Sequence, residues 1–156
     1  MFTYDYKNDL SLLAEAFKQS ESTIKLWQKS KPKQAFMLDN AFNYCNDYDE
    51  LKPFVNRLVE LETIKEVNAE LGLPSAPDRL VDEGFSKSAY WKWFKENRHL
   101  YVAMVMGYSE FKVQNLVTNT NQDLITKILT KLSKKELLSL YISDADSLIK
   151  LINTLK

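Results

Sequence analysis

Apolar residues along this chain recur at the spacing of an α-helix. In the segment 9–18, Leu10, Leu13, Ala14 and Phe17 stand at positions i, i+3, i+4 and i+7, so they share one helix face. Two amphipathic runs near the C-terminus repeat this pattern, and no segment shows the apolar–polar alternation of a β-strand. The pattern predicts an all-α protein, a small multi-helix bundle.

Prolines and glycines predict where helices begin and end in the first half. Pro32 suits the first turn of a helix, so a break is expected near Ser30–Lys31. One long helix is expected to begin near Pro53 and to run through Leu71. Gly72 and the two prolines that follow it predict its end.

The second half is expected to begin with a short helix near Asp78–Glu83, followed by an aromatic helix from about Ser88. Gly107 and the polar run 118–121 are expected to interrupt the helices that follow. The segment 133–136, Ser-Lys-Lys-Glu, has the pattern of a capping box at a helix start. The chain is therefore expected to form two modules, residues 1–71 and 72–156.

Composition and charge restrict the class of protein. Of 156 residues, 45% are hydrophobic, enough for a sizeable core, and 21 basic residues balance 21 acidic ones. Any attraction to nucleic acid must then come from a local patch. The single Cys45 excludes an internal disulfide, there is no signal-peptide pattern, and no apolar run approaches the roughly 20 residues of a membrane span. We expect a cytoplasmic protein with no membrane partner.

Segment 13–27 has residues suited to two short helices that cross at a steep angle. Two large apolar residues and a small one would pack the first helix, a serine would cap the second, and two apolar residues would anchor it. These residues are Leu13, Phe17, Ala14, Ser20, Ile24 and Trp27. The other face of the second helix would stay exposed.

This segment resembles the helix-turn-helix superfamily of bacterial and phage regulators over roughly 20 residues. The shared pattern is Leu-Ala, two variable residues, an apolar residue, a turn ending in Ser, then an aliphatic residue and a Trp. The chain departs from it in the turn, where Lys18 replaces the usual glycine and Gln19 the usual apolar residue. A left-handed lysine there costs about 1 kcal/mol. The resemblance implies helix-turn-helix modules and binding to double-stranded DNA through the second helix.

Local charge agrees with that implication. Between Lys18 and Lys33 there are five lysines against Glu21 alone, and five minus one gives +4. Under the resemblance, three residues are candidates for base edges: Ser22, Thr23 and Lys25. Three lysines are better suited to phosphates: Lys29, Lys31 and Lys33. A flexible ammonium group can hold the protein on the DNA backbone but distinguishes poorly between bases.

The chain also resembles itself at an offset of 66 residues, which suggests a divergent tandem repeat. The identical pairs are Ser20/Ser86, Ser22/Ser88, Trp27/Trp93 and Lys29/Lys95. Aromatic residues surround the second copy of the helix, which favours burial of most of them. Its outer face is expected to be a second surface, for DNA or for a protein partner: Lys87, Trp91, Lys92, Phe94 and Lys95.

No motif for catalysis or metal binding is present. The chain lacks a phosphate-binding glycine loop, an HExxH motif and a nucleophile elbow. His99 has no triad-like neighbours, Cys45 has no partner at metal spacing, and the acidic run 47–50 lacks the glycine of a calcium loop. We expect neither an enzyme nor a metal or cofactor site.

The sequence thus favours a sequence-specific, double-stranded DNA-binding regulator of transcription, of phage or plasmid type. It is expected to form a homodimer through residues 84–156. The alternative is a helical protein-binding module, an inhibitor or adaptor, which the neutral net charge and the exposed aromatic face around Trp91 favour. A purely structural bundle is the third interpretation.

Overall fold

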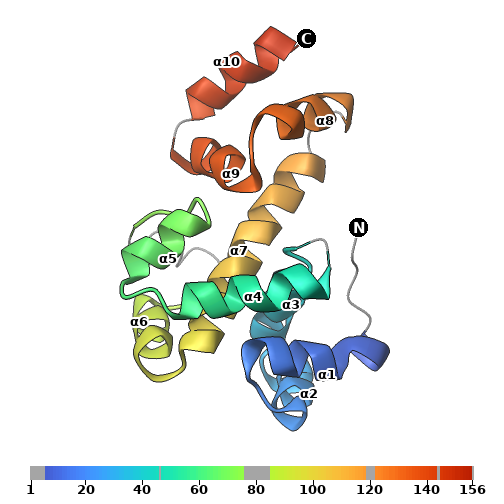
Figure 1. The fold of residues 1–156 in the computed structure, drawn as a ribbon, viewed down its shortest axis with the longest axis vertical. Coiled ribbons are helices and arrows are strands. Elements are labelled where there is room, and N and C mark those ends of the chain that lie inside the picture. Colours follow the sequence, from blue (N-terminus) through green and yellow to red (C-terminus); the bar gives the residue numbers. More distant parts are fainter. Residues whose placement is uncertain (1–5, 46, 76–84, 119–121, 144, 156) are drawn as a thin grey trace.

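The computed structural model describes residues 6–45, 47–75, 85–118, 122–143 and 145–155. These residues form helices joined by short connections, without a β-strand among them, so the protein is all-α (Figure 1). The helices are α1 Tyr6–Phe17, α2 Glu21–Ser30, α3 Pro32–Phe42, α4 Tyr48–Val59, α5 Ile64–Glu70, α6 Lys87–Glu96, α7 Arg98–Thr118, α8 Gln122–Lys131, α9 Lys134–Ser143 and α10 Ala145–Leu155.

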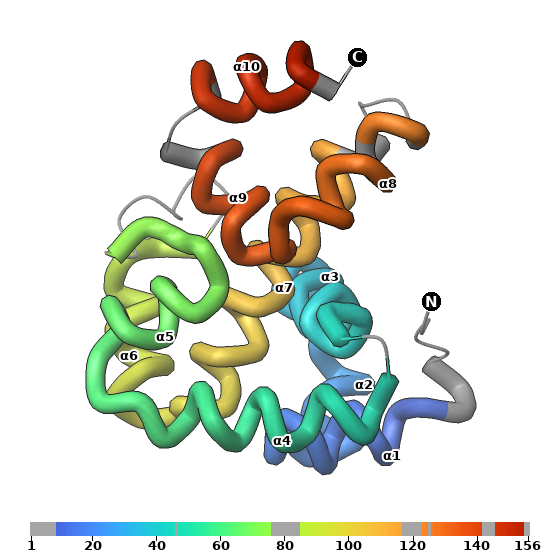
Figure 2. The backbone as a smooth tube through the Cα atoms, turned by 45° about the horizontal axis from the view of Figure 1, so that its top comes forward, coloured from blue at the N-terminus to red at the C-terminus, as the bar shows by residue number. Residues whose placement is uncertain are grey.

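Helix α7 is the longest element, at 21 residues, and the other helices are arranged around it. Helices α1, α2 and α6 lie at one end of the molecule, and α8, α9 and α10 lie at the other, as both views show (Figures 1 and 2). Residues 101–110 of α7 are all buried, because α3 and α4 pack along the helix. A long helix that is apolar on every side is typical of a bundle centre.

The expected interruption at Gly107 is wrong, because this glycine lies within α7. A methyl group added there would lie 2.0 Å from the carbonyl oxygen of Met37 in α3. Gly107 therefore allows the backbones of α3 and α7 to touch, which is a packing role and not a helix-breaking one.

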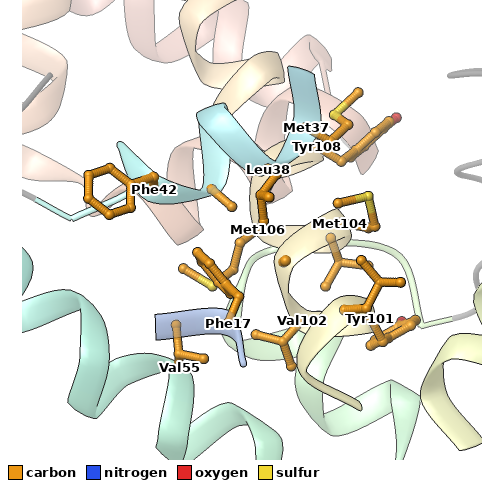
Figure 3. Close-up of a cluster of buried hydrophobic side chains, with 14 of the residues drawn as sticks. Phe17, Met37, Leu38, Phe42, Val55, Tyr101, Val102, Met104, Met106 and Tyr108 are labelled. Atoms are coloured by element: carbon orange, nitrogen blue, oxygen red, sulfur yellow. The ribbon is translucent and has the colours of Figure 1, made fainter. Parts of the chain in front are cut away.

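One hydrophobic core joins the two halves of the chain. Phe17 of α1, Leu38 of α3 and Val55 of α4 share it with Val102 and Met106 of α7 (Figure 3). The two expected modules, 1–71 and 72–156, thus contribute to the same core. A smaller cluster forms the interior beneath the last three helices: Ile128, Leu137 and Leu148.

The single long helix expected between Pro53 and Leu71 is instead two helices, α4 and α5. Thr63 caps α5 by a capping box: its hydroxyl accepts from Glu66 N at 3.1 Å, and the Glu66 carboxylate accepts from Thr63 N at 2.9 Å. Pro53 lies inside α4 rather than at its start. The break is stabilised by these side-chain hydrogen bonds to the backbone. The spacing of apolar residues does not report such bonds, so periodicity alone did not reveal the break.

Three other helix boundaries are where the sequence places them. Pro32 begins α3, and Gly72 follows α5 with a φ of 71°. The capping box of α9 forms, with Ser133 N donating to Glu136 at 2.9 Å and Glu136 N donating to Ser133 at 3.2 Å. The short helix expected at 78–83 lies outside the described residues.

Among the described helices, none combines the length and the apolar character that crossing a membrane requires.

Candidate nucleic-acid interface

The turn between α1 and α2 has the left-handed residue that the sequence predicts. Lys18 has a φ of 48°. Gln19 N donates to Ala14 O at 3.1 Å, and Lys18 N donates to Glu15 O at 3.4 Å, which together form a Schellman closure of α1. Residues 18–20 thereby connect α1 to α2 in a tight turn, as a helix-turn-helix requires.

Ser20 caps α2, as expected. Its Oγ accepts from Thr23 N at 3.1 Å and donates to Thr23 Oγ1 at 2.6 Å. The Oγ atoms of Ser20 and Ser22 are 3.2 Å apart. The hydroxyl oxygen of Thr23 therefore accepts a hydrogen bond within the cap, and its side chain is half exposed.

Buried residues hold α2 by a single face. Ile24 and Trp27 belong to the same core as Leu13 and Phe17 of α1. Ala14, expected to be the small residue where the helices cross, is half buried, whereas Ala16, two residues further on, is the buried alanine of α1. Packing through one face leaves the rest of α2 accessible.

The exposed face of α2 contains three of the six residues predicted to bind DNA, which are Ser22, Lys25 and Lys29. It forms a shallow hollow lined by five residues of this one helix: Ser22, Lys25, Leu26, Gln28 and Lys29. Lys31 and Lys33, also exposed, extend it onto the start of α3. The part of the chain that the structure describes provides no ion-pair partner for Lys25 or Lys29. These ammonium groups can therefore meet an external anion.

Two members of this surface were not predicted, Leu26 and Gln28. Leu26 is 60% exposed, and Gln28 lies one turn from Lys25 on the same face. The sequence could have predicted both, because residues three and four apart share a helix face. A glutamine amide both donates and accepts, so Gln28 is chemically suited to an adenine edge.

Helix α6 repeats α2 at the predicted offset. Adding 66 to Glu21 and Ser30 gives Lys87 and Glu96, the bounds of α6, and Pro32 plus 66 gives the start of α7. Ser86 caps α6 as Ser20 caps α2: its Oγ accepts from Ala89 N at 3.1 Å and lies 3.0 Å from Ser88 Oγ.

The junctions that follow the two helices also match. Lys31 has φ −138° and ψ 65°, and its N–H donates to Trp27 O at 2.9 Å. Asn97 has φ −146° and ψ 75°, and its N–H donates to Trp93 O at 2.8 Å. Equal caps and equal junctions show that the two segments have the same local structure.

No family model matches this chain, and no curated protein or solved structure is significantly similar to it.

The face of α6 differs from the expectation at one residue. Lys87, Lys92 and Lys95 are exposed, and Trp91 is 49% exposed. Phe94 was expected to lie on this outer face and is instead half buried, because the Arg98 guanidinium lies 3.7 Å from its ring centroid. Arg98 covers the ring, which leaves Trp91 as the aromatic group on the surface.

The remaining titratable candidates lie away from the α2 face or are inert. Burial raises the pKa of Cys45 to about 11, so the thiol stays protonated at neutral pH and is a poor nucleophile. Burial, with a contribution from the charge of Lys18, lowers the pKa of His99. Burial raises the pKa of Asp39 to about 6. Within the described ranges, no three His, Cys, Asp or Glu residues are placed to hold a metal ion.

Proposed function

We propose that this protein is a sequence-specific DNA-binding regulator of transcription whose helix α2 enters the major groove. The observation that carries the proposal is that Ile24 and Trp27 anchor α2 from one side, while Lys25 and Lys29 point to solvent on the other. A helix fits the major groove only when one full face is free of the protein's own packing.

The chemistry of the face supports different roles for its residues. Ser22, Lys25 and Gln28 lie on the outer side of α2, and Lys25 can donate to the O6 and N7 acceptors of guanine. Lys29 lies in the last turn of α2, and Lys31 and Lys33 follow at the start of α3, where the three are suited to phosphates. A regulator needs no catalytic group, because it acts by occupying its site.

A duplex-binding measurement tests the proposal. A duplex selected from a random pool is titrated with the wild type and with Lys25→Glu plus Lys29→Glu (K25E/K29E). Reversing two charges at the interface should weaken binding roughly 100-fold and reduce the slope of log affinity against log salt by about 2. The matched control, K65E/K150E, changes net charge equally on exposed residues of α5 and α10 and should bind as the wild type does. Equal affinity of the K25E/K29E variant and the control would refute the proposal.

The second candidate function is a protein-binding module. Its supporting observation is the exposure of two large apolar side chains, Leu26 at 60% and Trp91 at 49%. Salt discriminates between the two functions, because a partner held by apolar groups should respond little to ionic strength, whereas DNA affinity should fall steeply.

A further inference from the structure

The two copies of the repeat contact each other, and residues at matching positions take part on both sides. In a two-fold pair, a contact of residue i with residue j of the partner is matched by a contact of j with i. Gln19, before α2, donates to Asn97, after α6, at 3.3 Å. Adding 66 to Gln19 gives Phe85, and subtracting 66 from Asn97 gives Lys31. Phe85 and Lys31 also lie together, as they line one pocket at the start of α3.

The helices that follow α2 and α6, which are α3 and α7, also contact each other. Met37 of α3 touches Gly107 of α7, and Gly107 is the equivalent of Ala41. Met37 has its own equivalent in Ala103, and both alanines are fully buried. The segments that begin at residues 19 and 85 therefore pack against each other through their matching helices α3 and α7.

The repeat makes the outer faces of α2 and α6 equivalent, because the two helices have the same caps, lengths and junctions. Both helices lie at the end of the molecule away from α8–α10, on either side of α7 (Figures 1 and 2). The exposed residues Ser22 and Lys29 of α2 correspond to Ser88 and Lys95 of α6, which are exposed too. One chain therefore carries two equivalent helix faces, a number that helix-turn-helix proteins with one motif per chain obtain by dimerising.

We infer that a single chain places both α2 and α6 on one DNA duplex and recognises a site with two unequal halves. The inference rests on the proposed function and specifies its target. Exposed Lys92 and Lys95 give α6 the positive charge that binding to phosphates requires. A second chain, which the sequence led us to expect at residues 84–156, is then not needed for a two-part site.

The differences between the two faces determine how the halves differ. Lys25 of α2 corresponds to Trp91 of α6, and Leu26 corresponds to Lys92. An ammonium at the first position favours guanine, whereas an indole there favours an apolar contact such as the methyl group of thymine. The selected site should thus contain a guanine in the half under α2 and no matching guanine in the half under α6.

Stoichiometry and footprinting together test the inference. Native mass spectrometry of the wild type on its selected duplex should give one chain per duplex, and hydroxyl-radical footprinting should give two protected segments. Lys92→Glu plus Lys95→Glu (K92E/K95E) should lose one segment and weaken binding roughly tenfold or more. The K25E/K29E variant should lose the other segment, and the K65E/K150E control should lose neither.

The outcomes distinguish a failure of this inference from a failure of the proposed DNA-binding function. If the wild type binds its duplex but the K92E/K95E variant binds with equal affinity and an unchanged footprint, α6 does not contact DNA and the inference is wrong while the function stands. A different result would be two chains bound to one duplex, with protection of both halves lost in the K25E/K29E variant and kept in the K92E/K95E variant. That result would also overturn the inference and leave the function standing. If the wild type selects no duplex, both the function and the inference fail.

Discussion

At the scale of single residues, Lys18 shows how local strain is accommodated in the turn before α2. Its φ of 48° is unfavourable for a residue with a Cβ, yet two hydrogen bonds to the end of α1 hold the backbone there. Glycine adopts the same conformation without steric cost. The turn therefore depends on its hydrogen bonds and not on a preference of lysine.

Replacing Lys18 by glycine should stabilise the protein. We expect the free energy of unfolding of Lys18→Gly to exceed that of Lys18→Ala by about 1 kcal/mol, because both variants lose the lysine side chain and only glycine relieves the positive φ. Urea unfolding followed by circular dichroism measures both. An alanine variant as stable as the glycine variant would show that the turn is not strained at this residue.

At the scale of helices, the contact between α3 and α7 depends on the absence of a side chain. In most helices, alanine is more stable than glycine by about 1 kcal/mol. At Gly107 the added methyl would lie 2.0 Å from the Met37 carbonyl oxygen and 2.7 Å from its carbon, both of them backbone atoms. The two helices would have to separate to accept it.

The variant Gly107→Ala should therefore be less stable than the wild type, although the same substitution stabilises most helices. We expect its free energy of unfolding to fall by about 3 kcal/mol, the upper range for overpacking a core. Thermal and urea unfolding measure the change. A gain in stability would mean that helix propensity outweighs the clash and that α3 and α7 have room to move.

At the scale of the whole molecule, one buried carboxylate links the last helices to the rest. Glu110 of α7, whose side chain is 2% exposed, pairs with Lys134 of α9 at 2.9 Å. The same ammonium donates to the carbonyl oxygen of Tyr44, also at 2.9 Å. Lys134 thus connects α9 to α7 and to the end of α3.

Removing the lysine should destabilise the protein more than removing both charges. Lys134→Met leaves the Glu110 carboxylate buried without its cation, and we expect the free energy of unfolding to fall by about 3 kcal/mol. The double variant E110Q/K134M carries no buried charge and should recover part of that loss. Chemical unfolding measures the stability of both variants. Equal stability of the wild type and Lys134→Met would mean that the ion pair contributes nothing to the free energy of unfolding.

Much of the local structure was predictable, because the deciding interactions span six residues or fewer. The caps at Ser20 and Ser133 and the glycine after α5 follow from residue type and spacing. The left-handed Lys18 follows from its place in the turn of the motif that the segment resembles. The break before α5 has the same kind of local signal in Thr63 and Glu66. The lysine-bearing face of α2 was predictable too, since periodicity indicates which side of a helix is apolar.

The sequence by itself determined the helices, most of their ends and the match of local structure at an offset of 66 residues. Tertiary structure alone decided that Gly107 is a contact point within a helix, against the backbone of Met37 in α3. It also decided that the two copies face each other through α3 and α7. Periodicity shows that a helix has an apolar face but not which distant helix covers that face, because the covering residues lie tens of positions away.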